Sequence, residues 1–285
     1  MKLTLLFILI LSSLSFVQAK DNSLASGMSP KFYKKRSEPI LNIALVYYGD
    51  YYSQEDLTRV QLMLEKRFFA ATDKSIKINT VVSALLPFKH KLENYPDFRQ
   101  DYVTDPERLQ RLWYYDNVGA RILVEVYDEF KKKSPELNIS LNQLDALIII
   151  TGAQFDALGF ASGRVAVTEN PMEIAWGLPD GGRVDYISDA KVVDELIHEI
   201  GHVMFLDHAA SQCFLPGMSY QESQLCCANS PAKEDVMSYC RNRTLVNDDF
   251  FFGFKDCNLR NIKNKVIPAM LGGKAWNIAN REKCL

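Results

Sequence analysis

The sequence predicts an α/β fold with mostly parallel strands. Its first half alternates β-rich apolar runs with helical patterns, and parallel strands are joined by crossover helices of that kind. The β-rich runs are residues 41–48, 76–86 and 145–151. The third run contains Leu147-Ile148-Ile149-Ile150, a continuous apolar stretch that is typical of a strand buried on both faces.

Helical patterns lie between these strands. We expect Ser53 to cap a helix that continues to about residue 71, and a second helix to extend over residues 104–133. After the third strand, residues 159–168 are short, contain glycine and alternate apolar with other residues, which predicts an edge strand. Residues 183–187 predict a further brief strand, entered through a Pro-Asp-Gly-Gly turn.

The beginning of the chain has the layout of a secretory signal peptide over residues 1–19. Lys2 precedes an apolar run at residues 5–11, and the segment ends in Val17-Gln18-Ala19, a small-residue cleavage site. We therefore expect a secreted protein, extracellular or periplasmic if the host is a Gram-negative bacterium. Residues 20–39 predict a flexible lead-in or a short pro-segment. No later segment has the roughly 20 apolar residues of a membrane helix, so we expect no transmembrane segment.

Composition and cysteine content narrow the class of protein. The chain has 285 residues, 47% of them hydrophobic, and its net charge of -2 gives no reason to expect a nucleic-acid partner. All six cysteines lie in the C-terminal third, at positions 213, 226, 227, 240, 257 and 284. An even number in an exported chain predicts disulfide bonds, with 15 possible pairings that the sequence does not distinguish. A second, structural zinc site is the alternative, although adjacent Cys226 and Cys227 lack finger-like spacing.

The clearest chemical signal is a cluster of histidines on a predicted helix at residues 190–204, capped by Ser188 or Asp189. Residues 192, 196, 200 and 203 form an apolar stripe that would face the sheet. His198 and His202 are four positions apart, so their imidazoles project to the same side of the helix and can chelate one ion.

The stretch around these histidines matches the HExxH signature of zinc peptidases. In that signature two imidazoles bind zinc, and the glutamate, here Glu199, accepts a proton from water. His208 follows six residues after His202, so three of the four histidines fall within eleven positions. Imidazole is the commonest zinc-binding side chain, and we expect His198, His202 and His208 to bind Zn²⁺.

On these residues the sequence resembles the metzincin metallopeptidases. The family pattern is HExxH, two residues, a glycine, two residues and a third histidine, and the run here is HEIGHVMFLDH. Phe205 stands where the family usually has glycine. That glycine ends the helix and lets the chain turn back to the metal, and a phenylalanine would be strained in the same left-handed conformation. We therefore expect either a different helix end or a less ideal position of His208 as the third ligand.

The family also has a methionine turn after the third histidine. Asp235-Val236-Met237-Ser238-Tyr239 matches it, which implies that Met237 lies beneath the zinc and that Tyr239 reaches the metal or the developing oxyanion. Met218, in Gly217-Met218-Ser219-Tyr220, has the same Met-Ser-Tyr order and is the competing position. Either methionine could instead simply fill the core.

The resemblance implies a twisted sheet with an antiparallel edge strand that pairs with substrate, followed by the zinc helix. It implies an N-terminal catalytic subdomain at residues 40–208 and a cysteine-rich, disulfide-containing C-terminal subdomain at residues 209–285. It also implies a secreted zinc metalloendopeptidase, a hydrolase acting on a peptide or protein substrate. Zinc with three protein nitrogens keeps one position for water, from which Glu199 takes a proton before passing it to the leaving amine.

Two alternatives remain open from the sequence. Glu222 or Glu234 could replace His208 as the third ligand, or the chain could be a binding module with a structural zinc on an inactive peptidase fold. Phe205 is the best support for the second alternative, and Glu199 argues against it. Cleavage specificity, disulfide connectivity and oligomeric state do not follow from the sequence.

Overall fold

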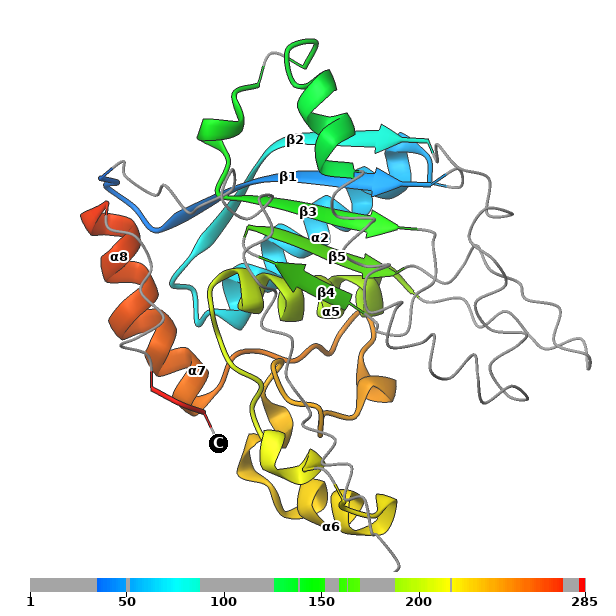
Figure 1. The fold of residues 1–285 in the computed structure, drawn as a ribbon, viewed down its shortest axis with the longest axis vertical. Coiled ribbons are helices and arrows are strands. Elements are labelled where there is room, and N and C mark those ends of the chain that lie inside the picture. Colours follow the sequence, from blue (N-terminus) through cyan, green and yellow to red (C-terminus); the bar gives the residue numbers. More distant parts are fainter. Residues whose placement is uncertain are drawn as a thin grey trace, which may run out of the picture.

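The structure is a computed structural model that describes residues 35–49, 52–87, 126–137, 139–151, 159–162, 164–169, 188–215, 217–273 and 282–284. Within these residues a five-stranded sheet has the strand order β2-β1-β3-β5-β4 (Figure 1). Strands β2, β1, β3 and β5 are parallel neighbours, whereas β4 pairs with β5 in the antiparallel sense at the edge. The predicted α/β fold, mostly parallel with an antiparallel edge strand, is therefore confirmed.

The elements have the following bounds. The strands are β1 (Ile40–Tyr48), β2 (Lys77–Leu86), β3 (Ala146–Thr151), β4 (Gly159–Ser162) and β5 (Val165–Glu169). The α-helices are α2 (Gln54–Ala71), α5 (Asp189–Val203), α6 (Tyr220–Asn229), α7 (Asp256–Asn261) and α8 (Ile267–Gly272), the last two joined by a π-helical turn at Ile262–Val266. Short 3₁₀ turns occur at Leu141–Gln143, Ser211–Phe214, Pro231–Glu234 and Arg243–Leu245.

The predicted edge strand at residues 159–168 is in fact two strands, and only the first lies at the edge. The chain reverses after Ser162, so that β5 runs back between β3 and β4, with Val165 opposite Leu147, and β4 lies along the outer side of β5. Ser162-Gly163-Arg164 is a turn-type sequence. The alternation of apolar residues continues through both strands, so it does not reveal the turn between them. Alternation indicates on which face of the sheet a residue lies, but not where one strand ends and the next begins.

Helices cover both faces of the sheet. In β1, the side chains of Leu41, Ile43, Leu45 and Tyr47 pack with α2 and α5, whereas those of Ala44, Val46 and Tyr48 pack against the helical residues 126–133. This alternation follows from the two-residue period of a strand. The helix α2 begins as predicted at Ser53, whose side chain accepts the Asp56 N–H in a capping box.

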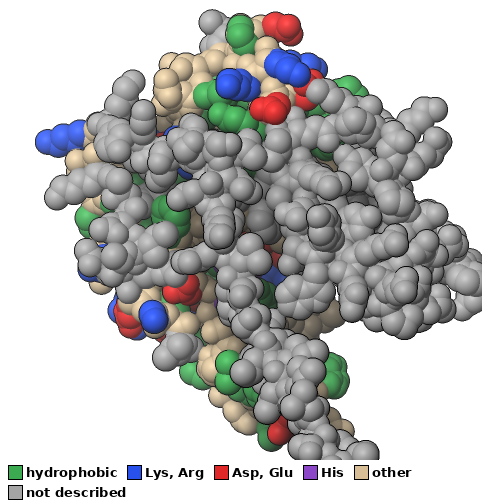
Figure 2. Space-filling model, in the orientation of Figure 1, with side chains coloured by type: hydrophobic (Ala, Val, Ile, Leu, Met, Phe, Trp, Pro, Cys, Tyr) green, Lys and Arg blue, Asp and Glu red, His purple; other side chains and the backbone are tan. Residues whose placement is uncertain are grey.

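Three predictions lie wholly or partly outside the described residues. These are the signal peptide with most of the lead-in, the first part of the helix at residues 104–133, and the strand at residues 183–187. Among the described residues, no helix is long and apolar enough to cross a membrane. Figure 2 shows basic and acidic side chains mixed at the top of the molecule, in keeping with the small net charge.

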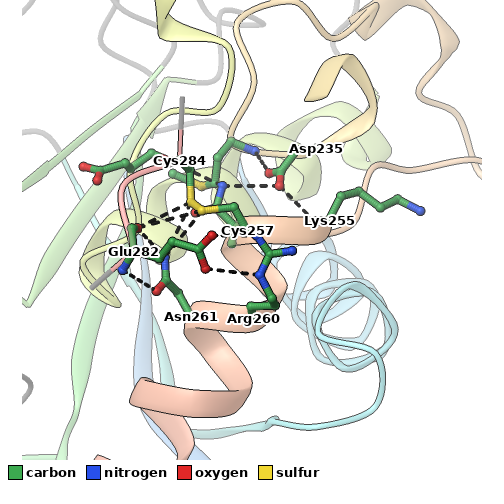
Figure 3. Close-up of a disulfide and its surroundings, with 10 residues drawn as sticks. Asp235, Lys255, Cys257, Arg260, Asn261, Glu282 and Cys284 are labelled. Atoms are coloured by element: carbon green, nitrogen blue, oxygen red, sulfur yellow. Dashed lines mark hydrogen bonds and ion pairs between the residues drawn. A yellow bond between two sulfur atoms is a disulfide. The ribbon is translucent and has the colours of Figure 1, made fainter. Parts of the chain in front are cut away.

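The six cysteines form three disulfide bonds, Cys213–Cys226, Cys227–Cys240 and Cys257–Cys284. The third joins the end of the chain to α7, where Asn261 and Arg260 also bond to Glu282 (Figure 3). The expected disulfides are confirmed. Because every cysteine is paired, none offers a thiolate for the alternative structural zinc site.

Candidate metal centre

The helix α5 carries the site, and its burial follows from its sequence. Val192, Leu196, Ile200 and Val203 are each at most 1% exposed and belong to the core between α5, α2 and the sheet. Ser188 occupies the N-cap position, without a side-chain hydrogen bond. The apolar stripe fixes the rotation of the helix. The opposite side, with both histidines, therefore faces the C-terminal part of the chain.

Three imidazole nitrogens converge beside this helix. The Nε2 atom of His202 lies 3.2 Å from Nε2 of His198 and 2.9 Å from Nε2 of His208. Ligands placed tetrahedrally about 2.0–2.1 Å from a zinc ion would be about 3.3–3.4 Å apart. The distances between the three nitrogens are thus close to those between three ligands of one tetrahedral zinc ion. The three histidines form a group that can hold a metal.

In two of the three histidines, the other ring nitrogen bonds to a backbone carbonyl. Nδ1 of His198 lies 2.8 Å from the carbonyl oxygen of Val236, and Nδ1 of His202 lies 3.2 Å from that of Leu206. A carbonyl only accepts, so each Nδ1 carries the proton and donates it, which leaves Nε2 with a free lone pair. Burial lowers the pKa of His208 to about 3 and that of His198 well below its usual range, so these rings are neutral at pH 7.

Phe205 adopts the conformation that a glycine would take. Its φ angle is 60°, its N–H donates to the His202 carbonyl and the N–H of Leu206 donates to the Gly201 carbonyl. These two bonds form a Schellman motif with Phe205 at the left-handed position. The helix therefore ends as it would with a glycine, and Phe205 adopts the left-handed conformation at a cost of about 1–2 kcal/mol of backbone strain. The chain then turns back and brings His208 to the other two histidines.

Glu199 is a buried carboxyl group beside the first ligand. It is 4% exposed, and among the described residues no group hydrogen-bonds to its Oε2 atom. A Cβ atom on Gly159 would lie 2.3 Å from Oε1 of Glu199, so the glycine at the start of β4 leaves the space that this carboxyl group occupies. Burial raises the pKa of Glu199 to about 8, with a further contribution from the charge of Glu195.

Met237 lies under the histidine-bearing helix. Its side chain is fully buried, and a Cβ atom on Gly201 would lie 2.3 Å from its sulfur. Asp235 shapes the turn, because its carboxylate accepts the N–H groups of Met237 at 2.7 Å and Lys255 at 2.9 Å (Figure 3). The close approach of Met237 to the helix is possible because residue 201, between the two histidines, has no side chain.

Tyr239 packs on the third histidine. The centroid of its ring lies 4.1 Å from that of His208 and 6.4 Å from that of His198. Burial raises the pKa of its phenol, and the charge of Glu199 raises it further, so the phenol keeps its proton at neutral pH. It can therefore donate a hydrogen bond to an oxygen that gains negative charge.

Sequence reasoning missed a buried arginine next to the site. The side chain of Arg241 is 0% exposed and bonds to Asp194 at 3.2 Å and to Glu195 at 2.9 Å, both on α5. Its Nη1 atom donates to the Ser238 carbonyl and lies 3.1 Å from Nδ1 of His198. Arg241 thus joins the methionine turn to the helix. Asp194 stands four residues before His198, and that spacing was the signal available in the sequence.

The other sequence candidates lie apart from the histidines. Glu222 is exposed and accepts the Ser219 N–H in the capping box of α6, and Glu234 is also exposed. Among the described residues, neither belongs to the group of three histidines that can hold a metal. Met218 is half-buried just before α6.

No protein-family model and no curated protein matches the sequence. Similar solved structures include an archaemetzincin from Methanopyrus kandleri, with a TM-score of 0.43 and 15% identity over 80% of this chain and 96% of that one. A zinc-dependent peptidase from Methanocorpusculum labreanum has a TM-score of 0.32 and 16% identity over 59% of this chain and 83% of that one.

A chaperone–substrate complex is also similar, with a TM-score of 0.37 and 12% identity over 87% of this chain and 36% of that one. None of the three TM-scores reaches 0.5. The function must therefore follow from the residues of the site itself.

Proposed function

We propose that this chain is a secreted, zinc-dependent endopeptidase of the metzincin type. The observation that carries the proposal is the convergence of three imidazole Nε2 atoms beside a buried carboxyl group. In the part of the chain that the structure describes, that group has one oxygen without a hydrogen-bond partner. A purely structural zinc site has no use for such a carboxyl group, since a buried polar group without a partner reduces stability.

The donor set fits zinc. Three imidazole nitrogens, with the Nδ1 atoms of His198 and His202 bonded to backbone carbonyls, are typical of a catalytic zinc site that keeps one position open. His198, His202 and His208 would be the ligands, and Met237 would form an apolar floor beneath them. Bound there, zinc would supply Lewis acidity to the attacking water and to the scissile carbonyl group.

The residues of the chain would carry the proton transfers. Glu199, as a carboxylate, would accept the proton of the attacking water and then donate it to the nitrogen of the leaving amine. Its burial excludes bulk water, and a bound cation nearby would favour the ionised form that a base needs. Tyr239 would donate its phenolic hydrogen to the carbonyl oxygen as negative charge develops on it.

Two further features support a peptide substrate and export. The edge strand β4 begins at Gly159, directly against Glu199, and an extended peptide can pair with a sheet edge. A peptide bound there would lie beside the carboxyl group. Three disulfides agree with an oxidising compartment.

The test compares zinc content and peptide cleavage in the mature chain and two variants. We expect Glu199→Gln to keep one zinc per chain and to lose peptide hydrolysis by about 10²–10⁴-fold, because general-base catalysis contributes that much. The exposed Glu222 provides the matched control, and Glu222→Gln should retain both properties. Equal turnover by wild type and Glu199→Gln would refute the proposal.

The competing proposal is a binding module with a structural zinc. Its support in the sequence was Phe205, but Phe205 closes the helix in the conformation expected of a glycine. A wild-type chain that binds zinc tightly and cleaves none of a broad set of peptides would favour this alternative.

A further inference from the structure

Two aromatic side chains, those of Tyr239 and Phe214, extend from the histidines to the surface. The ring of Phe214 meets that of Tyr239 edge-on with a centroid distance of 5.6 Å, and Tyr239 in turn lies 4.1 Å from His208. Phe214 is 43% exposed and Tyr239 is 47% exposed. Both rings thus have a protein-facing part and a solvent-facing part, and the apolar surface is continuous with the candidate metal centre.

Each of the two aromatic residues adjoins a cysteine. Cys213 precedes Phe214, and Cys240 follows Tyr239. Their disulfide partners, Cys226 and Cys227, are neighbours on α6. The sulfur atoms of Cys213, Cys227 and Cys240 lie within 4.8 Å of one another. One turn of α6 is therefore bonded covalently to the backbone on both sides of the aromatic pair.

The disulfides lie in a region of short elements. Among the described residues, Phe214 ends a 3₁₀ turn of four residues, Ser211–Phe214, and one β-bridge, Ala209 to Ser238, joins this part of the chain to the methionine turn. The local apolar cluster has three buried members, Ala210, Cys213 and Cys227. A cluster of this size buries little apolar area, so we expect the two disulfides to contribute to the stability of this region by restricting the unfolded chain.

We propose that Phe214 is a specificity-determining residue of this site, and that the adjacent disulfides Cys213–Cys226 and Cys227–Cys240 hold it beside Tyr239 for that role. This inference rests on the proposed peptidase function. A large apolar side chain next to the scissile bond would cover the exposed part of the Phe214 ring. Removal of two apolar surfaces from water, together with ring contact, favours such substrates over small or acidic ones.

The experiment uses fluorogenic peptides that differ at one position, with Phe, Leu, Ala or Asp placed on either side of the scissile bond. The quantity measured is the ratio of kcat/KM for the Phe peptide to that for the Ala peptide. We expect wild type to prefer Phe, and Phe214→Ala to reduce that ratio about tenfold, mainly through KM. Phe250 offers a matched control, because it is also 43% exposed and its ring contacts Phe252. Phe250→Ala should leave the ratio unchanged.

A second pair of variants tests the role of the disulfides. The double variant Cys213→Ala/Cys226→Ala lacks the disulfide beside Phe214. The double variant Cys257→Ala/Cys284→Ala lacks the disulfide between α7 and residue 284 (Figure 3). We expect only the first pair to reduce the preference for Phe, and both proteins to keep zinc. Should the first pair not fold, Cys227→Ala/Cys240→Ala tests the role of the disulfides in its place, and Phe214→Ala still tests the role of the ring because it leaves every disulfide intact.

The outcomes separate the inference from the function on which it rests. Peptide cleavage without a preference for apolar residues, or an equal change of the ratio in Phe214→Ala and Phe250→Ala, would overturn the inference alone. A chain that holds zinc and cleaves no peptide would overturn the proposed function, and the preference with it.

Discussion

Gly201→Ala should destabilise the protein, although the same change in an ordinary helix stabilises it. Gly201 lies inside α5, where alanine is favoured over glycine by about 1 kcal/mol. Here the new methyl group would lie 2.3 Å from the sulfur of Met237 and 3.1 Å from both Cε of Met237 and Cε1 of Phe254. The methionine must therefore move by more than an ångström.

The structure sets the magnitude of this effect. Met237 is fully buried, so it has no solvent-filled space into which it can move. Insertion of an extra methyl group into a packed core costs about 1–3 kcal/mol. After the gain in helix propensity is subtracted, we expect a net loss of about 1 kcal/mol, which lowers Tm by about 2–4 °C.

A double-mutant cycle with Met237→Ala isolates the contact. The free energy of unfolding is measured in urea on the zinc-free protein, because bound zinc would add its own contribution to the stability. With Met237 shortened, Gly201→Ala should become stabilising by about 1 kcal/mol, which gives a coupling energy of about 2 kcal/mol. If Gly201→Ala stabilises the protein while Met237 is intact, the packing of the methionine under the helix is wrong.

Three further predictions concern the residues around the site. Phe205→Val should be less stable than Phe205→Asn by about 1 kcal/mol in urea, because a β-branched residue is poorly accommodated at φ 60° whereas asparagine tolerates it; equal stabilities would contradict the left-handed helix end. Arg241→Met should lower the free energy of unfolding by about 3–5 kcal/mol, since it leaves two buried carboxylates without their counter-charge. The exposed Arg260→Met serves as its control and should change little. Burial raises the pKa of Asp235 to about 6, so the folded chain binds this proton more tightly than the unfolded chain, where the pKa is about 3.9. The stability of wild type relative to Asp235→Asn should therefore rise by about 2–3 kcal/mol as the pH falls from 7 to 4, and a stability difference independent of pH would refute the shift.

The sequence was informative where one physical requirement dominates. The run Leu147-Ile148-Ile149-Ile150 is typical of a strand covered on both faces, and the structure buries all four residues in β3. The capping box at Ser53 marks the start of α2 through local hydrogen bonds alone. The spacing of His198 and His202 determines that both rings project from one side of α5, because helix geometry leaves no alternative.

Other features depend on contacts between residues far apart in the chain. The turn between β4 and β5 was hidden because apolar alternation continues through the hairpin. The pairing of the cysteines is set by the tertiary position of α6, which brings Cys226 and Cys227 to chain segments on both sides of them. Arg241 looked like one of several basic residues, and its role depends on carboxylates 46 and 47 positions earlier.

The left-handed conformation of Phe205 shows the limit of backbone preferences as a guide. A preference of about 1–2 kcal/mol for glycine at that position is smaller than the packing energy of the surrounding core, against which the half-buried Phe205 ring lies. Tertiary packing can therefore hold a bulky residue there. The predicted division of the chain near residue 208 stays a prediction.

The most direct measurement is the crystal structure of the zinc-loaded protein. We predict one zinc ion with Nε2 of His198, His202 and His208 each at about 2.0–2.1 Å, and a fourth position that faces Glu199. An ion bound elsewhere, or one of these three rings turned away from it, would contradict the proposed metal centre.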